Sequence, residues 1–156
     1  MRREEKGVTE REILDRIIQG SAYCHLACCQ DDRPYLIPIS FGYDGQAIYI
    51  HTAPEGKKIL IFERNPQVSL SFVCQAELIT DPQQACHWSF GFSSVFAEGE
   101  ICELTDIEDK RYALNQIMAH YSGHKWEIPE SRLSGTRVWK IPLKNISGKI
   151  SPAPSR

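Results

Sequence analysis

The sequence predicts a mainly β protein with a few helices, folded as a Greek-key type antiparallel barrel. Segments in which apolar and polar residues alternate fill most of residues 23–104, and short turns separate them. Helical periodicity is confined to a few short stretches that do not alternate regularly with the strands. A parallel Rossmann sheet is therefore not expected. The 156 residues have the length of one domain, which we place at residues 1–150.

A helix is expected before residue 20. Thr9 and Glu12 have the spacing of a capping box, and Gly20 is a suitable C-terminal stop. Between these signals, apolar residues recur at helical spacing, at Ile13, Leu14, Ile17 and Ile18. We therefore expect Thr9 to cap a helix that buries this stripe.

Three strands are expected next, joined by tight turns. Residues 24–28 alternate in polarity, and turn residues at 31–34 separate them from a second strand at 35–43. Asp44-Gly45 is a strong hairpin signal. Residues 46–52, rich in Ile and Tyr, then return as the third strand, paired with the second.

The break at residues 54–56 precedes a short helix at Lys57–Arg64, which Asn65-Pro66 ends. Residues 67–78 alternate again and predict another strand. Residues 85–104 form a long β-prone region with glycines at 91 and 99. This region predicts two strands or one bent strand.

The last third of the chain predicts one more helix and one more strand. Thr105 and Glu108 form a second capping box, and the expected buried face contains Ile107, Leu114, Ile117, Met118 and Tyr121. A polar segment then leads to a final strand at 136–146. Residues 151–156 contain mainly Ser and Pro, which predicts a frayed tail.

Composition excludes several classes of protein. The formal net charge is −2 and hydrophobic residues make up 42% of the chain, so we expect neither disorder nor binding to nucleic acid. No apolar run approaches the ~20 residues of a membrane-spanning helix. The N-terminus lacks the apolar stretch of a signal peptide. We therefore expect a cytoplasmic protein that binds no membrane, with its six cysteines as thiols in the core.

The cysteines and histidines do not predict a metal site. Cys24 and Cys28 share one face of the expected strand, whereas His25 and Cys29 share the other. One tetrahedral site cannot easily use both faces, so thiols in the core are the simpler interpretation.

Two further pairs are weak evidence for chemistry. His120 and His124 stand near the end of a helix, where solvated histidines are the simpler interpretation. Cys86-His87 could form a thiolate pair, but adjacency alone does not establish one. The neighbouring aromatic residues, Trp88 and Phe90, are expected to pack in the core or in a dimer interface.

The segment at residues 50–58 predicts an anion site. A strand ends there, a glycine-containing loop follows, and Lys57 and Lys58 occupy the first turn of a helix. Cations in a first turn oppose the helix dipole, so a bound anion, most simply a phosphate, would explain them. The alternative is that both lysines are solvated surface residues.

Several segments occur in an order and spacing that are specific as a set. They are residues 34–43 (PYLIPISFGY), 48–51 (IYIH), 55–58 (EGKK), 65–68 (NPQV) and 93–99 (SSVFAEG). Over residues 1–147, the chain resembles the pyridoxamine 5′-phosphate oxidase-like FMN-binding split barrels, and most of all their Nim-type (nitroimidazole-resistance-related) branch. Met1-Arg2-Arg3 and Arg137-Val138-Trp139 are also similar to that branch.

The resemblance implies a homodimer that holds FMN at the subunit interface. It implies that the edge of the flavin ring is gripped by backbone groups of Pro38, Ile39, Ser40 and Phe41. The strand beside the ring and ribityl chain would contain Tyr49, Ile50, His51 and Thr52. The phosphate would meet Lys57, Lys58, Ser93 and Ser94, and Trp139 would approach from the partner chain.

One segment departs from the family pattern. The family often has Tyr-Arg-Ser-Val where residues 92–95 of this chain are Phe-Ser-Ser-Val. Loss of that arginine removes a bidentate phosphate donor, which lysine does not replace. Haem or a deazaflavin is therefore an alternative cofactor.

The resemblance implies an FMN-dependent oxidoreductase that passes a hydride or electrons to a small acceptor such as a nitro compound. His51 is the candidate catalytic residue, because an imidazole near the flavin could donate a proton; the alternative is a structural histidine. The alternative function is a non-catalytic flavin- or haem-binding protein acting as sensor, store or scavenger. Oxidation of pyridoxamine phosphate itself is not expected, because residues 132–150 lack its arginine-rich signature.

Overall fold

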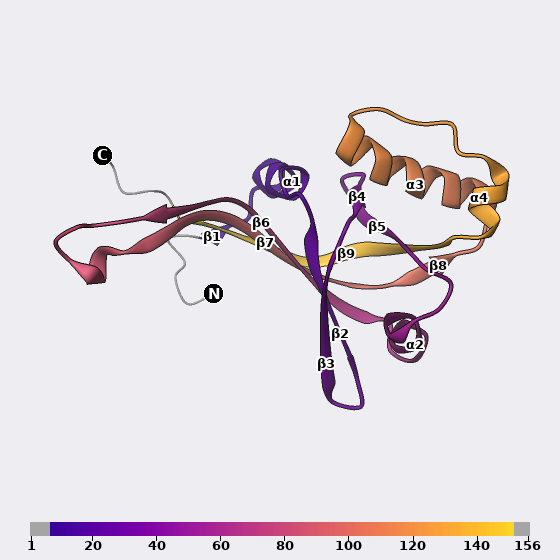
Figure 1. Ribbon diagram of the computed structural model, residues 1–156, viewed down its shortest axis with the longest axis horizontal. Helices are drawn as coiled ribbons and strands as arrows, with labels where there is room; N and C mark the ends of the chain where they lie inside the picture. The colour runs from indigo at the N-terminus through magenta and orange to yellow at the C-terminus, as the bar shows by residue number, and fades with distance from the viewer. Residues whose placement is uncertain (1–6, 152–156) are drawn as a thin grey trace.

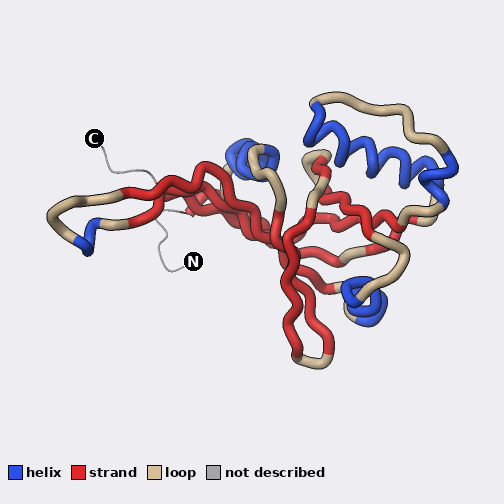
Figure 2. The backbone as a smooth tube through the Cα atoms, viewed as in Figure 1, coloured by secondary structure: helices blue, strands red, loops and turns tan. Residues whose placement is uncertain are grey.

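The computed structural model describes residues 7–151, and these form a mainly β, antiparallel fold (Figures 1 and 2). The strands are β1 (Gly7–Val8), β2 (Cys24–Gln30), β3 (Arg33–Ile39), β4 (Gly42–Tyr43), β5 (Ala47–Thr52), β6 (Gln67–Ile79), β7 (Ser89–Glu100), β8 (Cys102–Leu104) and β9 (Arg137–Ser151). The helices are α1 (Arg11–Gln19), α2 (Lys57–Arg64), α3 (Ile107–Ser122), α4 (Glu130–Ser134) and the short 3-10 helix η2 (Ala85–His87). Two segments named in the sequence analysis lie outside the described residues. They are Met1-Arg2-Arg3, which is similar to the Nim-type branch, and residues 152–156 of the predicted tail.

All nine strands of the described chain join one sheet, and β9 connects its two halves. The order is β3-β2-β6-β7-β9-β5-β4, with β1 and β8 also paired to β9. The C-terminal part of β9 pairs with β7 and its N-terminal part pairs with β5. The predicted final strand was therefore too short, because pairing with β7 extends β9 to Ser151, one residue into the predicted tail.

Two of the predicted helix caps are wrong, although the helices themselves are confirmed. The N-cap of α1 is Glu10 rather than Thr9, because β1 pairs with β9 immediately before the helix, and no side chain caps it. The N-cap of α3 is Asp106 rather than Thr105, and its carboxylate accepts hydrogen bonds from the amides of Glu108 and Asp109. No helix in the described part of the chain is long and apolar enough to cross a membrane.

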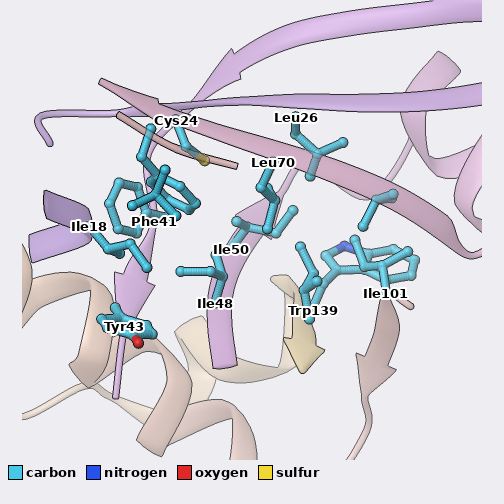
Figure 3. Packing of buried hydrophobic residues seen from close by; sticks show 14 of the residues in the cluster. Ile18, Cys24, Leu26, Phe41, Tyr43, Ile48, Ile50, Leu70, Ile101 and Trp139 are labelled. Carbon is cyan, nitrogen blue, oxygen red and sulfur yellow. The ribbon is translucent and has the colours of Figure 1, made fainter. Parts of the chain in front are cut away.

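The core lies between the two halves of the bent sheet (Figure 3). Alternate residues of β2, β5, β6 and β7 face inward, and α1 and α2 pack against them. Phe41 meets Phe72 edge to face with ring centroids 5.1 Å apart. Cys24 and Cys28 are buried here as predicted, whereas Cys86 and Cys102 are exposed, so the prediction of six core thiols is wrong for those two. Burial raises the pKa of Cys24 to about 12, which keeps it an unreactive thiol.

The strand predicted at 35–43 is split into β3 and β4 by Ser40 and Phe41. β3 lies at one end of the sheet order, so its outer edge has no strand partner within the described residues. Pro34 and Pro38 fit this position, because an edge strand tolerates residues that cannot donate a backbone hydrogen bond.

β6 and β7 continue beyond the body of the molecule as a two-stranded arm, closed by η2 at its tip (Figure 1). The pairing shifts between Cys74 and Glu77, which marks a β-bulge at the base of the arm. Trp88 and Phe90 lie near the tip and are about half exposed. The expectation that they pack in the core is therefore wrong, because the arm extends away from it.

α3 packs on β4 and β5 through a very close approach at Gly42. A Cβ atom at this position would lie 2.4 Å from the backbone carbon of Gln116. The buried face of α3 consists of Ala113 and Ile117. It is narrower than predicted, because Tyr121 is about half exposed and uses its hydroxyl group to bond the backbone instead.

Candidate functional site

The N-terminus of α2 is exposed and has no side-chain cap. Gly56 precedes it with φ of 145°, a conformation that glycine adopts without strain. The first turn contains no acidic residue, and it contains Lys57, which is exposed, and Lys58, which is half-buried. The terminus therefore combines backbone amides that no described side chain caps with two lysines in the first turn, and this combination suits a phosphate.

Lys57 extends from α2 toward β2 and β3. Its Nζ lies 4.7 Å from the centroid of the Tyr35 ring, within the range of a cation–π contact. Burial, with the neighbouring Cys29, raises the pKa of the Cys28 thiol, and the positive charge of Lys57 opposes this shift. The lysine thus lies between the helix terminus and the edge strand.

A pocket of about 370 Å³ borders Lys57, and its lining includes an arginine that the sequence did not indicate as a site residue. Arg33 lines it together with Gln30 and Asp31, at the tip of the β2–β3 hairpin. Arg33 has the fork-shaped guanidinium that the Phe-Ser-Ser-Val segment lacks. Its only signal in the sequence is its place at the start of β3, which does not by itself indicate a ligand.

The predicted ring-edge residues lie at the end of β3. Pro38 and Ser40 are exposed and Ile39 is half-buried, so their backbone groups border the edge of the sheet. Phe41 differs, because its side chain is fully buried and its amide donates to the hydroxyl of Tyr121 over 3.2 Å. The Phe41 amide is therefore already bonded within the chain, whereas Pro38 to Ser40 lie at the edge of the sheet.

The predicted residues of β5 are divided between two faces. Ile50 and Thr52 face the core, where Thr52 Oγ1 accepts a hydrogen bond from Trp139 Nε1 over 3.0 Å. Tyr49 faces α3, is buried, and donates its hydroxyl hydrogen to Asp44 over 2.7 Å. Trp139 is only 3% exposed, so its side chain is not available to a cofactor at the surface of this chain.

His51 is the exposed exception on β5. It faces the same side as Tyr49, and its ring borders an open pocket of about 360 Å³ between β5 and α3. Within the described residues, the ring makes no hydrogen bond, which leaves both nitrogen atoms available to a ligand. The pocket side of His51 is lined by apolar side chains, including Met118 and Trp126.

Ser93 and Ser94 do not lie near the two lysines in one chain. They pair with Cys74 and Val73 of β6, whereas Cys28, beside Lys57, pairs with Val68 of the same strand. Val73 lies five residues along β6 from Val68, which corresponds to about 16 Å between the two places. Ser93 is buried, and both hydroxyl groups already face acceptors, on Gln75 and Lys149 respectively. A single phosphate on this chain could therefore not meet both groups.

The remaining candidate histidines, His87 and His120, contact other parts of the chain. No group of three or more potential metal ligands occurs among residues 7–151. His120 is not a solvated histidine, because its ring packs 4.4 Å from that of Phe41 and bonds the carbonyl oxygen of Ser21. His87 bonds Asp81 over 2.8 Å at the exposed tip of the arm.

The fold is an open antiparallel barrel, and a cationic helix terminus lies beside the edge of its sheet. These features are typical of small ligand-binding barrels, and similarity to known proteins identifies the family. The sequence profile described as pyridoxamine 5′-phosphate oxidase matches residues 10–150. The chain therefore belongs to this family and has its split-barrel fold. An uncharacterized protein of Rhizobium meliloti (strain 1021) is 38% identical over 148 residues, which cover 94% of this chain and 82% of that protein.

Solved structures agree with the family and with the Nim-type branch. A protein from Bacteroides thetaiotaomicron, described as a candidate 5-nitroimidazole antibiotic resistance protein, is 29% identical with a TM-score of 0.82, covering 92% of this chain and 86% of that one. The flavocytochrome Anf3 from Azotobacter vinelandii is 18% identical with a TM-score of 0.83, covering 99% and 73%. An FAD and heme binding protein from Mycobacterium smegmatis is 19% identical with a TM-score of 0.81, covering 97% and 76%. At the identities of the last two, the similarity shows the fold alone.

Proposed function

We propose that this protein is an FMN-dependent oxidoreductase of the cytoplasm that transfers electrons or a hydride to a small acceptor such as a nitro compound. The observation that carries the proposal is the uncapped N-terminus of α2, whose first turn contains Lys57 and Lys58 and where Lys57 contacts Tyr35 of the edge strand β3. This arrangement fits the phosphate of FMN, and membership of a pyridoxamine 5′-phosphate oxidase family supports it.

The chain supplies binding and orientation, whereas a bound flavin would supply the redox chemistry. Lys57, Lys58 and the amides of the first turn of α2 would hold the phosphate. Backbone groups from Pro38 to Ser40 would meet the edge of the ring system. His51 would donate a proton or a hydrogen bond to the acceptor, because its ring is exposed and makes no other hydrogen bond in the described chain.

We also propose that the active form is a homodimer. The outer face of the β3-β2-β6-β7 sheet has exposed apolar residues at Leu36, Val73 and Phe96, with small or half-buried residues such as Ala27 and Ser69 between them. A second copy on this face would cover them. It would also allow Ser94 of one chain to approach a phosphate held by Lys57 of the other.

The dimer is tested by Ser69→Arg, which places a long cation in the centre of this face. Light scattering is expected to show a dimer for the unchanged protein and a monomer for the variant. Ser131→Arg, on the exposed surface of α4, is the matched control and should leave the dimer intact. A monomeric unchanged protein would contradict this part of the proposal.

The activity is tested under anaerobic conditions. The flavin of the FMN-loaded protein is first reduced, and the protein is then mixed with a nitroaromatic compound. We expect flavin absorbance to return as the nitro group is reduced, and we expect His51→Ala to slow this return without changing FMN affinity. Failure of the reduced protein to be reoxidised by any nitro compound tested would contradict the activity.

The second candidate is a non-catalytic flavin- or haem-binding protein acting as sensor, store or scavenger. The observation that favours it is His51, an exposed imidazole beside an apolar pocket, which is the environment of a haem ligand. Two proteins of the same fold are described as a flavocytochrome and as an FAD and heme binding protein. A Soret band that disappears in His51→Ala would favour this candidate over the oxidoreductase.

A further inference from the structure

The pocket beside His51 has an unusual lining for this chain, because it is almost entirely apolar. Its volume is about 360 Å³, at the lower end of the range for small-molecule sites, which is about 300–1,000 Å³. The apolar wall consists of Leu114, Ile117 and Met118 from α3 and of Trp126 and Ile128 from the segment between α3 and α4.

The wall is held in place before any ligand binds. The backbone amide of Trp126 donates to Asn115 Oδ1 over 2.7 Å, and its Nε1 donates to Ser122 Oγ over 2.9 Å. The ring of His124 lies 4.6 Å from the indole. Trp126 is nevertheless 50% exposed, so its ring presents a fixed aromatic surface to the pocket.

The narrow packing face of α3 explains why the pocket exists. Ala113 and Ile117 form the buried stripe against β4 and β5. Leu114 and Met118 stand one position further round the helix and one turn apart, so they are only partly covered. Met118 contributes a thioether, which packs favourably against aromatic rings.

The polar groups of the pocket are few. Thr136 lines it, but its hydroxyl group donates to the carbonyl oxygen of Arg132 over 2.8 Å. His51 is the only ionisable residue among the described residues that line it. Burial of a charge against this wall costs free energy, because the wall offers few polar groups to replace the lost hydration.

We propose that this pocket binds a neutral, flat aromatic molecule of one or two rings, with a hydrogen-bonding substituent directed at His51. The proposal deepens the proposed function. It rests on that function only where it identifies the bound aromatic molecule as the electron acceptor. Trp126 and Met118 contact the ring, and His51 contacts the substituent. The pocket lies on the α3 side of β5, whereas the predicted phosphate site lies at α2, so the pocket and the phosphate site are different places on the chain.

The test uses 4-nitrobenzyl alcohol with cofactor-free protein, measured by calorimetry. Trp126→Ala is expected to weaken binding about tenfold, which corresponds to about 1.4 kcal/mol. Trp88→Ala is the matched control, because Trp88 is 52% exposed and its Nε1 also donates one hydrogen bond, but it lies on the arm. His51→Ala is expected to weaken binding severalfold, and His87→Ala is expected to leave it unchanged.

Two further measurements keep the proposal falsifiable. Met118→Glu places a charge in the wall without removing Trp126, and it should abolish binding of 4-nitrobenzyl alcohol. This variant replaces Trp126→Ala as the test if Trp126→Ala does not fold. Charged 4-nitrobenzoate and non-aromatic cyclohexylmethanol should bind more weakly than 4-nitrobenzyl alcohol.

Equal affinities in Trp126→Ala and Trp88→Ala would overturn the proposal, as would displacement of 4-nitrobenzyl alcohol by FMN. Binding of 4-nitrobenzyl alcohol is measured without cofactor, so it does not depend on FMN. A separate titration in which FMN fails to bind would refute the proposed function but not the proposed pocket.

Discussion

The indole Nε1 of Trp139 donates a hydrogen bond to Thr52 Oγ1 over 3.0 Å, and both residues are buried. This bond joins β9 to the end of β5, immediately before the loop that leads to α2. The bond therefore ties the end of β5, next to the loop that leads to α2, to β9 and holds the Trp139 side chain in the core.

Thr52→Val is expected to lower the free energy of unfolding by about 1–3 kcal/mol, because it leaves a buried indole donor without an acceptor. Chemical denaturation measures this difference. Thr80→Val, at an exposed loop position, is the control and should change stability little. An equal effect of the two substitutions would show that the buried bond does not contribute.

Gly42→Ala should destabilise the protein strongly, because the added Cβ would lie 2.4 Å from the backbone of Gln116 and Ile117. We expect a loss of about 2–4 kcal/mol, since the backbone of α3 must move away from β4. Gly135→Ala is the matched control, because its Cβ would meet no atom closer than 4.0 Å. Thermal unfolding of both variants compares them directly, and similar melting temperatures would contradict the close packing of α3.

The Asp44 carboxylate predicts a dependence of stability on pH. Burial acts to raise its pKa, but hydrogen bonds from the Ala47 amide, the Tyr49 hydroxyl and the Gln46 amide outweigh burial and lower it below the ordinary 3.8. The folded state therefore binds this proton less readily than the unfolded state. The stabilisation is complete above about pH 5 and decreases as the pH falls through the lowered pKa.

Asp44→Asn should accordingly cost about 1–2 kcal/mol at pH 7 and progressively less below pH 4. Denaturation of both proteins between pH 7 and pH 3 measures the difference. A difference that stays constant over this range would show that the carboxylate does not carry the stabilisation.

Lys57→Gln is expected to weaken FMN binding roughly tenfold, because one charge-assisted contact to the phosphate is lost. Quenching of flavin fluorescence measures the affinity. Lys125→Gln removes an exposed lysine in the segment after α3 and should leave the affinity unchanged. Riboflavin has no phosphate, so its affinity should be the same for the unchanged protein and for Lys57→Gln.

Much of the fold could be predicted because local patterns agree with tertiary packing. Alternation of polarity identified β2 and β6. The Asp44-Gly45 signal, with the Ile- and Tyr-rich segment after it, identified the β4–β5 hairpin. The bounds of α2 were predicted fully, because a glycine precedes it and Asn65-Pro66 ends it. The length of β9 was missed, because it depends on pairing with β7, which no local pattern records.

The candidate site was only partly predictable. Lys57 and Lys58 were identified because cations are unusual in the first turn of a helix, and His51 was identified by resemblance. The structure leaves Lys57 and His51 exposed and Lys58 half-buried. Phe41 and Trp139 were assigned to the cofactor by resemblance, and within one chain their side chains are buried. Arg33 and Trp126 were missed, because each borders a pocket that is assembled from distant segments.

The central claim is that α2 binds the phosphate of FMN while the edge of β3 meets its ring system. The melting temperature of cofactor-free protein during titration with FMN tests this claim most directly. At an FMN concentration 100 times Kd, binding should stabilise the protein by about 2.7 kcal/mol. For a chain of this length, this stabilisation corresponds to a rise of about 5–10 °C. Riboflavin at the same concentration should produce a smaller rise. An unchanged melting temperature with FMN, or equal rises with FMN and riboflavin, would contradict the claim.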